Sequence, residues 1–371
     1  LHGSNLMKEI KLADASAEFR FFGGDLMEEV GGVLVKHYRE MAFMGYFDVI
    51  MNIKTIKRNI DFCRKDVLQF NPDVLVLIDY PGFNLRIAEF AKEHNIRVFY
   101  YISPKFWAWK EKRVKKVRAF VDEMFTIFPF ETAFYKKHGI DVHYVGNPLM
   151  DSLQEYKRKA VSESEFRKKN GLNERPIIAI LAGSRIKEVK RILPVMLKSL
   201  EQTDTYQYII AGVENFDREV YMKIIENYDV KIIYNQTYDL LNNAHTAIVA
   251  SGTATLETAL FKVPQLVMYR LEGGRVIDFI MRNFVMKTKW ASLPNIILQK
   301  TAVAEYIQKD MTVKKVKPEL KRLLDDKDYR KSILNDYDKL LERMGEEGCS
   351  KRAAEKMVNL LSLNSELKTL N

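Results

Sequence analysis

Short apolar runs alternate with helical stretches along most of this sequence. The clearest runs are DVLVLID at 73–79 and IIAIL at 177–181. A run that is apolar at consecutive positions is typical of a parallel strand buried on both faces. Regular alternation of such strands with helices predicts crossover connections between them. We therefore predict an α/β fold built from doubly wound parallel sheets.

The alternation occurs as two series, which predicts two domains. The chain has 371 residues, more than a single core usually organises. A polar and charged stretch, EYKRKAVSESEFRKKNGLNERP at 155–176, separates the series. We predict one domain over 1–158, a second over 159–340, and C-terminal helices over 341–371. Doubly wound domains bind ligands at the carboxyl ends of their strands, so we expect the two sets of loops to face a cleft.

The composition indicates a globular protein with anionic partners. Hydrophobic residues make up 47% of the chain and charged residues 29%, as in ordinary soluble domains. Two cysteines cannot form a disulfide framework and the six histidines are scattered, so we expect no metal site. Without an apolar run of ~18 residues or a signal peptide, we expect a cytoplasmic protein. The net charge of +10 favours nucleotides, phospholipid headgroups or nucleic acid as partners.

Asp79 is the strongest candidate for a catalytic group in the first series. It ends the apolar run 73–79 and is followed by Tyr80-Pro81-Gly82, a turn that stops the strand. A carboxylate held rigidly at a strand end can act as a general base on an acceptor hydroxyl. The alternative is an aspartate that caps the following turn or helix.

The second series contains a glycine loop directly after its first strand. Gly183, Ser184 and Arg185 follow the run 177–181. Glycine lets a ligand approach the backbone closely, and the arginine fork suits a pyrophosphate. The spacing matches neither a P-loop nor GxGxxG, so a surface arginine after a plain turn is the alternative.

A second loop of small residues opens another helix of the same series. Ser251, Gly252 and Thr253 can present hydroxyl and N–H groups to phosphate oxygens at a helix start. Glu257 lies about one turn into that helix, within reach of a ribose hydroxyl pair. The alternative for Glu257 is an acid that stabilises the helix dipole.

An aromatic segment precedes a run of basic residues in the first series. SPKFWAWKEKRVKKVR at 103–118 places Phe106, Trp107 and Trp109 before cations that include Arg113. This combination suits nucleic acid, a lipid–water interface or core packing. The segment 276–290 mixes apolar and basic residues in a similar way.

Seven ordered motifs give the chain a resemblance to the lipid-A-disaccharide synthase family: LIDYPGFN, YYISPKFWAWKEKRVKK, IFPFETAFYKKHG, YVGNPLMD, LAGSRIKEV, ASGTATLE and SLPNII. The resemblance implies a GT-B glycosyltransferase with two Rossmann-like domains, whose C-terminal helices cross back to the first domain. It implies transfer of 2,3-diacylglucosamine from its UDP donor to 2,3-diacylglucosamine 1-phosphate, lipid X, with release of UDP. It also implies a peripheral protein on the cytoplasmic face of the bacterial inner membrane.

The resemblance assigns a role to each candidate residue. Asp79 matches the proposed catalytic base, and the aromatic-basic segment becomes an acceptor or membrane contact through Phe106, Trp107, Trp109 and Arg113. The remaining candidates match the UDP-sugar site: Gly183, Ser184, Arg185, Ser251, Gly252, Thr253, Glu257 and Asn295.

The chain departs from the family pattern at its start. Family members open with a strand and a glycine-rich loop ending in Ser-Gly-Asp, just before residues that resemble Leu1-His2-Gly3. Because no strand precedes the helical stretch here, we expect the numbered sequence to lack a short N-terminal piece.

No metal or other cofactor is expected for the chemistry. Asp-x-Asp strings, which hold Mg²⁺ in many transferases, occur at 326–328 and 336–338, in a helical region away from any strand end. Arg185 and helix dipoles would instead stabilise the leaving diphosphate.

Two other functions stay open at this stage. A UDP-N-acetylglucosamine 2-epimerase-like enzyme would use the same nucleotide loops, and a nucleic-acid-binding protein would explain the positive charge. The second is less favoured because no RRM, KH or zinc-finger signature occurs. The oligomeric state is also open, with a homodimer as one alternative.

Overall fold

The computed structural model describes residues 1–41, 51–107, 113–201, 203–214, 216–250, 252–270 and 289–369, with side chains described as far as 363. The chain divides into two compact units. Unit 1 comprises Leu1–Asp151 together with Glu346–Asn371, and unit 2 comprises Ser152–Gly345.

Unit 2 is built on a parallel sheet with the strand order β12-β11-β10-β7-β8-β9. Its strands are β7 (Ile177–Leu181), β8 (Gln207–Gly212), β9 (Val230–Tyr234), β10 (Ala244–Ala250), β11 (Gln265–Tyr269) and β12 (Ala304–Ile307). Strands β8 and β9 extend the sheet from β7 in one direction. Strands β10, β11 and β12 then extend it from β7 in the opposite direction. This is the doubly wound arrangement that the sequence predicts.

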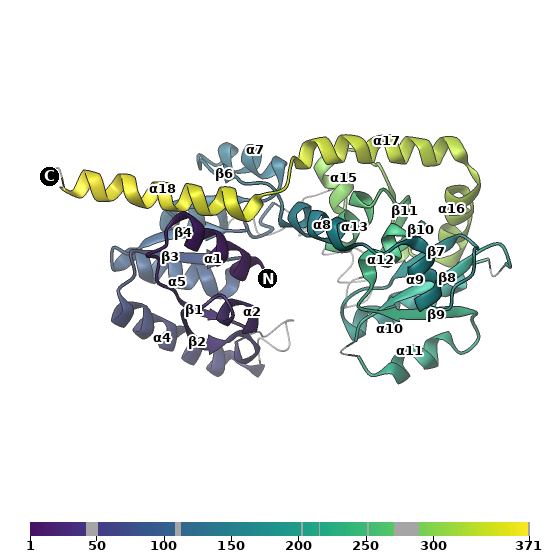
Figure 1. The fold of residues 1–371 in the computed structure, drawn as a ribbon, viewed down its shortest axis with the longest axis horizontal. Helices are drawn as coiled ribbons and strands as arrows, with labels where there is room; N and C mark the ends of the chain where they lie inside the picture. Colours follow the sequence, from purple (N-terminus) through teal and green to yellow (C-terminus); the bar gives the residue numbers. More distant parts are fainter. Residues whose placement is uncertain are drawn as a thin grey trace. The chain divides into compact units, whose positions relative to one another are not determined.

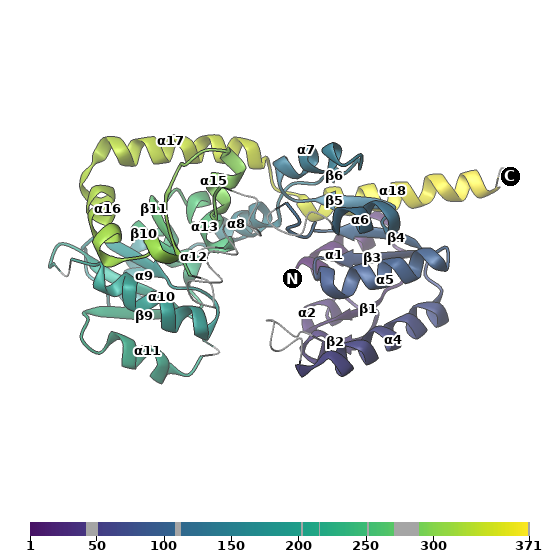
Figure 2. The same ribbon diagram turned by 180° about the vertical axis from the view of Figure 1, so that it is seen from behind.

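Helices cover both faces of this sheet (Figures 1 and 2). Ile177 and Leu181 pack with Phe166 and Leu240 on one face, whereas Ile178, which points to the other face, is also fully buried. The helices of unit 2 are α9 (Glu163–Lys169), α10 (Ile186–Lys198), α11 (Arg218–Ile225), α12 (Thr237–Asn242), α13 (Thr253–Leu260), α15 (Leu293–Leu298), α16 (Val313–Asp325) and α17 (Lys327–Met344), with a 3₁₀ turn η4 (Gln308–Asp310). Helix α8 (Pro148–Lys159) begins in unit 1 and continues into unit 2.

Unit 1 contains two parallel sheets, with strand orders β1-β2 and β3-β4-β5-β6. The bounds are β1 (Arg20–Gly23), β2 (Val33–His37), β3 (Val74–Ile78), β4 (Arg97–Tyr101), β5 (Glu123–Thr126) and β6 (His143–Tyr144). A cavity of about 1240 Å³ separates β1 from β3 and is lined by residues of both strands. Strands β1 and β2 were not predicted, because their apolar runs are short and partly exposed.

Amphipathic helices flank these sheets. In α4 the buried positions include Ile60, Cys63 and Val67, whose spacing puts them on one face toward the core. The helices of unit 1 are α1 (His2–Ala13), α2 (Asp25–Glu28), α4 (Ile53–Phe70), α5 (Pro81–Glu93), α6 (Val114–Phe120), α7 (Pro129–Lys137) and α18 (Cys349–Thr369), with a 3₁₀ turn η1 (Tyr38–Glu40).

The C-terminal helix α18 is part of unit 1, although unit 2 precedes it in the chain. Ala353 and Met357 of α18 pack with Leu6 of α1 and with Phe99 and Phe125 of the sheet, and α18 lies along α1 in Figure 1. The start of α18 is held by the carboxylate of Asp151. Its Oδ1 accepts hydrogen bonds from the backbone N–H groups of Gly348 (2.5 Å) and Cys349 (3.3 Å), which are among the donors that a helix start leaves unpaired.

Candidate active site

Asp79 lies directly after β3, in a backbone turn of unusual conformation. Asp79 and Tyr80 have φ angles of 44° and 41°, in the left-handed region, which costs on the order of 1–3 kcal/mol per residue. Surrounding bonds hold the turn: Asn84 Nδ2 donates to the Asp79 carbonyl (2.8 Å), and the Tyr100 hydroxyl also donates to it. The Asp79 N–H donates to the Tyr101 carbonyl (3.2 Å). The position of Asp79 is therefore fixed by bonds to β4 and to the first turn of α5.

The Asp79 carboxyl group opens to solvent but has protein atoms on its other sides. This partial burial raises the pKa of Asp79, while the positive charge of Lys105 lowers it. Helix α5 begins at Pro81 with Tyr80 as its N-cap residue, so the Asp79 side chain does not cap that helix. The lining of the unit 1 cavity reaches Asp79.

Lys105 lies close enough to Asp79 for its charge to lower the pKa of that carboxyl group, and the sequence analysis gave it no role. It belongs to the loop that follows β4, and β4 pairs with β3 so that Ile78 lies opposite Tyr101. The loops after the two strands therefore start side by side. The sequence signal was present, since Lys105 follows a predicted strand end, but the pairing of the two strands was not known.

Two of the aromatic residues predicted to contact the acceptor or a membrane are buried. Phe106 is 3% exposed and Trp107 is 8% exposed. The Trp107 ring packs edge-on against Phe128 and Phe130, and its Nε1–H donates to Glu131 Oε1 (3.2 Å). Core packing, one of the alternatives that the sequence left open, therefore takes up both rings, and contact with an acceptor or a membrane stays a prediction for these residues.

The other two residues of that prediction are placed differently. Arg113 is half-buried and forms the N-cap position of α6. Trp109 lies outside the described residues.

Glu131 is a fully buried carboxyl group that sequence reasoning did not single out. Besides Trp107, it accepts hydrogen bonds at Oε2 from the backbone N–H groups of Ile127 (3.2 Å) and Phe128 (3.0 Å). Burial raises its pKa to about 7, although these hydrogen bonds act in the opposite direction. Glu131 thereby joins the loop after β4 to the start of α7.

In unit 2, Gly183 and Gly252 follow strands that pair with each other. Val249 of β10 lies opposite Leu181 of β7, so the loops after these strands are neighbours. Gly183 has φ of 114° and Gly252 has φ of 130°, which side chains rarely allow. A Cβ on Gly183 would lie 2.8 Å from Glu188 Oε2, whereas a Cβ on Gly252 would meet no atom within 4 Å.

The side chains of the first glycine loop are exposed. Ser184 and Arg185 both face solvent. Arg185 is the N-cap residue of α10, and its Nη1 lies 3.4 Å from Glu188 Oε1. The guanidinium can therefore turn toward an anion bound over the start of α10.

The second glycine loop leads into α13. Thr253 is the first residue of α13 and is exposed, while Ser251 lies outside the described residues. Glu257 is half-buried and accepts a hydrogen bond from the Tyr238 hydroxyl (2.9 Å). Burial raises the pKa of Glu257, and the bond from Tyr238 lowers it. A carboxylate is thus held about one turn beyond the open backbone of Gly252.

Asn295 is completely buried and is bonded within the fold at both polar ends. Its Nδ2 donates to the carbonyl of Val303 (2.9 Å) and to Glu305 Oε1 (2.7 Å). Its Oδ1 accepts from the N–H groups of Ala302 (2.7 Å) and Val303 (2.9 Å). This arrangement supports a role in holding α15 to β12 rather than direct contact with a substrate.

Comparison with known proteins decides the family. A model of the family described as lipid-A-disaccharide synthetase matches residues 1–358. The chain belongs to the lipid-A-disaccharide synthase family. It is 34% identical to the enzyme of that name from Syntrophus aciditrophicus, covering 97% of this chain and 94% of the relative. The corresponding enzyme from Coxiella burnetii is 30% identical over 97% of this chain and 95% of its own length.

Solved structures show the same fold at low sequence identity. A UDP-GlcNAc 2-epimerase from Neisseria meningitidis has a TM-score of 0.65 and 14% identity, covering 96% of both chains. The calicheamicin glycosyltransferase CalG4 has a TM-score of 0.57 and 12% identity, covering 96% of this chain and 94% of that one. The predicted GT-B fold is confirmed. Membership of the synthase family identifies the chain as a glycosyltransferase enzyme, and likeness of fold alone does not favour the epimerase alternative.

Within the described residues of this synthase-family member, no group of three or more His, Cys, Asp or Glu side chains is placed to hold a metal ion. The Asp-x-Asp strings have local partners instead: Asp326 caps α17, Asp336 binds Lys300 and Asp338 binds Lys262. Among the helices described, none has the length and apolar character needed to cross a membrane.

Replacing Glu131 by Gln should remove one source of pH-dependent stability. Because the folded-state pKa lies above the ordinary value of 4.5, at about 7, protonated Glu131 stabilises the fold below pH 4.5, and this contribution disappears as pH rises through 7. We expect wild type to lose on the order of 3 kcal/mol more than Glu131→Gln between pH 4.5 and pH 8, measured by urea unfolding. Equal pH dependence of the two proteins would contradict this assignment.

Proposed function

We propose that this chain transfers 2,3-diacylglucosamine from UDP-2,3-diacylglucosamine to 2,3-diacylglucosamine 1-phosphate, lipid X. The products are the β(1→6)-linked disaccharide 1-phosphate and UDP. Family membership supports the reaction class. The observation that carries the assignment to residues is the carboxylate of Asp79, held in a strained turn at the carboxyl end of β3.

In this proposal Asp79 accepts the proton of the acceptor's 6-hydroxyl while the oxygen attacks the anomeric carbon. The new C–O bond forms as the bond from that carbon to the UDP oxygen breaks, and the electron pair leaves with UDP. Attack from the face opposite the leaving group inverts the α-linked donor to a β-linked product. A positioned base of this kind typically contributes about 10²–10⁴-fold to a rate.

The nucleotide side of the reaction is assigned to unit 2. The N–H groups at the start of α13, which has no side-chain cap, and the hydroxyl of Thr253 would hold phosphate oxygens, together with Ser251 and Ser184. Arg185 would neutralise the diphosphate as it leaves, and Glu257 would accept hydrogen bonds from the ribose. These groups can stabilise the leaving diphosphate without a metal ion.

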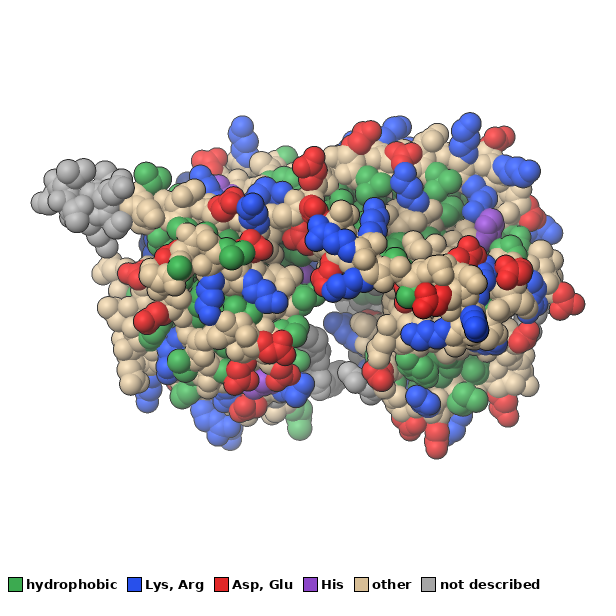
Figure 3. All heavy atoms as spheres, viewed as in Figure 1, with side chains coloured by type: hydrophobic (Ala, Val, Ile, Leu, Met, Phe, Trp, Pro, Cys, Tyr) green, Lys and Arg blue, Asp and Glu red, His purple; other side chains and the backbone are tan. Residues whose placement is uncertain are grey.

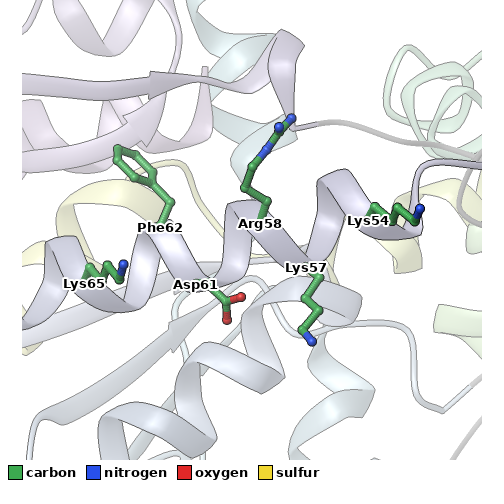
Figure 4. A pocket seen from close by; sticks show the side chains of 6 residues that line it. All are labelled: Lys54, Lys57, Arg58, Asp61, Phe62 and Lys65. Carbon is green, nitrogen blue, oxygen red and sulfur yellow. The ribbon is translucent and has the colours of Figure 1, made fainter.

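Contact with an anionic membrane on the cytoplasmic side is the second part of the proposal. Helix α4 presents Lys54, Lys57, Arg58 and Lys65 on the side away from the core, with Asp61 as an acid among them (Figure 4). Exposed apolar side chains occur on the same side: Ile53, Phe62 and Leu68. Basic side chains also project from the lower edge of unit 1 in Figure 3, below the position of α4 in Figure 1. Cations mixed with apolar groups on one helix face suit the surface of an anionic bilayer.

Asp79→Asn should reduce disaccharide formation at least 100-fold, because the proposed base is lost. UDP affinity should stay within about twofold of wild type, because in this proposal the nucleotide is held by unit 2. Product can be measured with radiolabelled lipid X, and UDP binding by titration calorimetry. Asp73→Asn, at the other end of β3, is the matched control and should keep full activity. An active Asp79→Asn would reject Asp79 as the base.

Lys105→Met should move the acid limb of the pH–rate profile to higher pH. Removing the nearby positive charge raises the pKa of Asp79 further, so the base is protonated over a wider pH range. Lys92→Met is a suitable control, since Lys92 pairs with Asp122 at the opposite edge of the sheet. If the acid limb of the pH–rate profile of Lys105→Met coincides with that of wild type, Lys105 does not influence the pKa of the base.

We expect binding to phosphatidylglycerol vesicles to weaken at least tenfold when the four basic residues of α4 are changed together to Gln: Lys54, Lys57, Arg58 and Lys65. Each cation near such a surface contributes about 1 kcal/mol. Sedimentation with vesicles measures the effect. The control changes the exposed lysines of α8 and α9 to Gln, which removes the same charge from unit 2: Lys157, Lys159, Lys168 and Lys169. If both variants lose vesicle binding equally, the net charge of the protein causes the binding and α4 has no special role.

A further inference from the structure

A network of hydrogen bonds in unit 2 is centred on the carboxylate of Glu305 in β12. Its Oε1 accepts from the backbone N–H (2.9 Å) and the hydroxyl (2.6 Å) of Ser292, and from Asn295 Nδ2 (2.7 Å). Its Oε2 accepts from the backbone N–H of Ala291 (2.8 Å). Both oxygens are therefore engaged with the segment that leads into α15.

This carboxylate satisfies donors that would otherwise be unpaired at a buried helix start. Ser292 is the N-cap residue of α15 and is completely buried, as is Asn295. A helix start buried without partners for its N–H groups is strongly unfavourable. Glu305 reaches both Ser292 and Asn295 from outside the helix.

The network continues to the helix that the proposed function assigns to the nucleotide. The backbone N–H of Leu293, the first residue of α15, donates to Thr255 Oγ1 (3.2 Å). The Thr255 hydroxyl in turn donates to the carbonyl of Gly252 (2.8 Å). A continuous path of bonds thus runs from β12 through α15 to the glycine loop after β10.

We infer that Glu305 is a positioning residue for the nucleotide-binding loop at Gly252, acting through Ser292, Leu293 and Thr255. This rests on the assignment of that loop to UDP. Thr255 is fully buried, so its hydroxyl acts from behind the loop, where it links the Leu293 N–H to the Gly252 carbonyl. The loop's open side then keeps its N–H groups aimed outward, toward a phosphate.

The test compares Glu305→Gln with Thr255→Val and Thr255→Ser in the full-length chain. Gln keeps the size of Glu305 but replaces one accepting oxygen by a donor, and Val keeps the shape of Thr255 without its hydroxyl. We expect Glu305→Gln and Thr255→Val each to weaken UDP binding about tenfold and to raise KM for the UDP-sugar similarly, with kcat within threefold. Loss of binding shared by ground and transition states has this signature. Thr255→Ser, which restores the hydroxyl, should bind UDP like wild type.

Glu319→Gln provides the control for loss of a carboxylate in unit 2, because Glu319 of α16 bonds to Tyr329 and not to α15. It should leave UDP affinity unchanged. If Glu305→Gln and Thr255→Val melt earlier but bind UDP like wild type, Glu305 is only a structural residue and the inference is overturned. If the wild-type chain itself fails to bind UDP, the assignment of the Gly252 loop to the nucleotide is rejected, and the inference about Glu305 is rejected together with it.

Discussion

The parallel pairing of strands determines where the candidate groups can meet. Parallel strands all end at one edge of a sheet, so residues far apart in the sequence become neighbours when their strands pair. Pairing of β7 with β10 brings Gly183 and Gly252 into adjacent loops. Pairing of β3 with β4 does the same for Asp79 and Lys105. Loss of either ladder would separate the groups that the proposed chemistry needs together.

Two hydrogen-bonded carboxylates, Glu131 fully buried and Glu305 half-buried, then hold helix starts in the two units. Glu131 joins the loop after β4 to α7, and Glu305 joins the start of α15 to β12. A carboxylate withdrawn from water needs hydrogen-bond donors around it. In both cases the donors include backbone N–H groups at a helix start and side chains close to it. The two residues therefore have the same structural use in different units, close to the edges that carry the candidate sites.

Trp107 and Asn295 show what a shared motif leaves undecided about the role of a residue. Trp107 and Asn295 lie in motifs shared with the family, and both were interpreted as contacts to substrate or membrane. In the structure Trp107 donates to Glu131, and Asn295 is saturated by Val303, Ala302 and Glu305. A shared motif indicates that a residue type is needed at a position, but a hydrogen-bonding side chain can be needed for the fold as well as for the ligand.

The sequence by itself determined the α/β class, the strand ends that carry the candidate site residues, and the family, because these depend on local apolar patterns and on ordered motifs. It also placed Asp79, Gly183 and Gly252 at strand ends, where a turn or a positive φ is required. Only the tertiary structure decided which strand ends are neighbours, which contacts hold α18 in unit 1, and which polar side chains are bonded inside the fold. Those outcomes depend on pairings between distant segments, and the free energy of such contacts is not encoded in any single stretch of the chain.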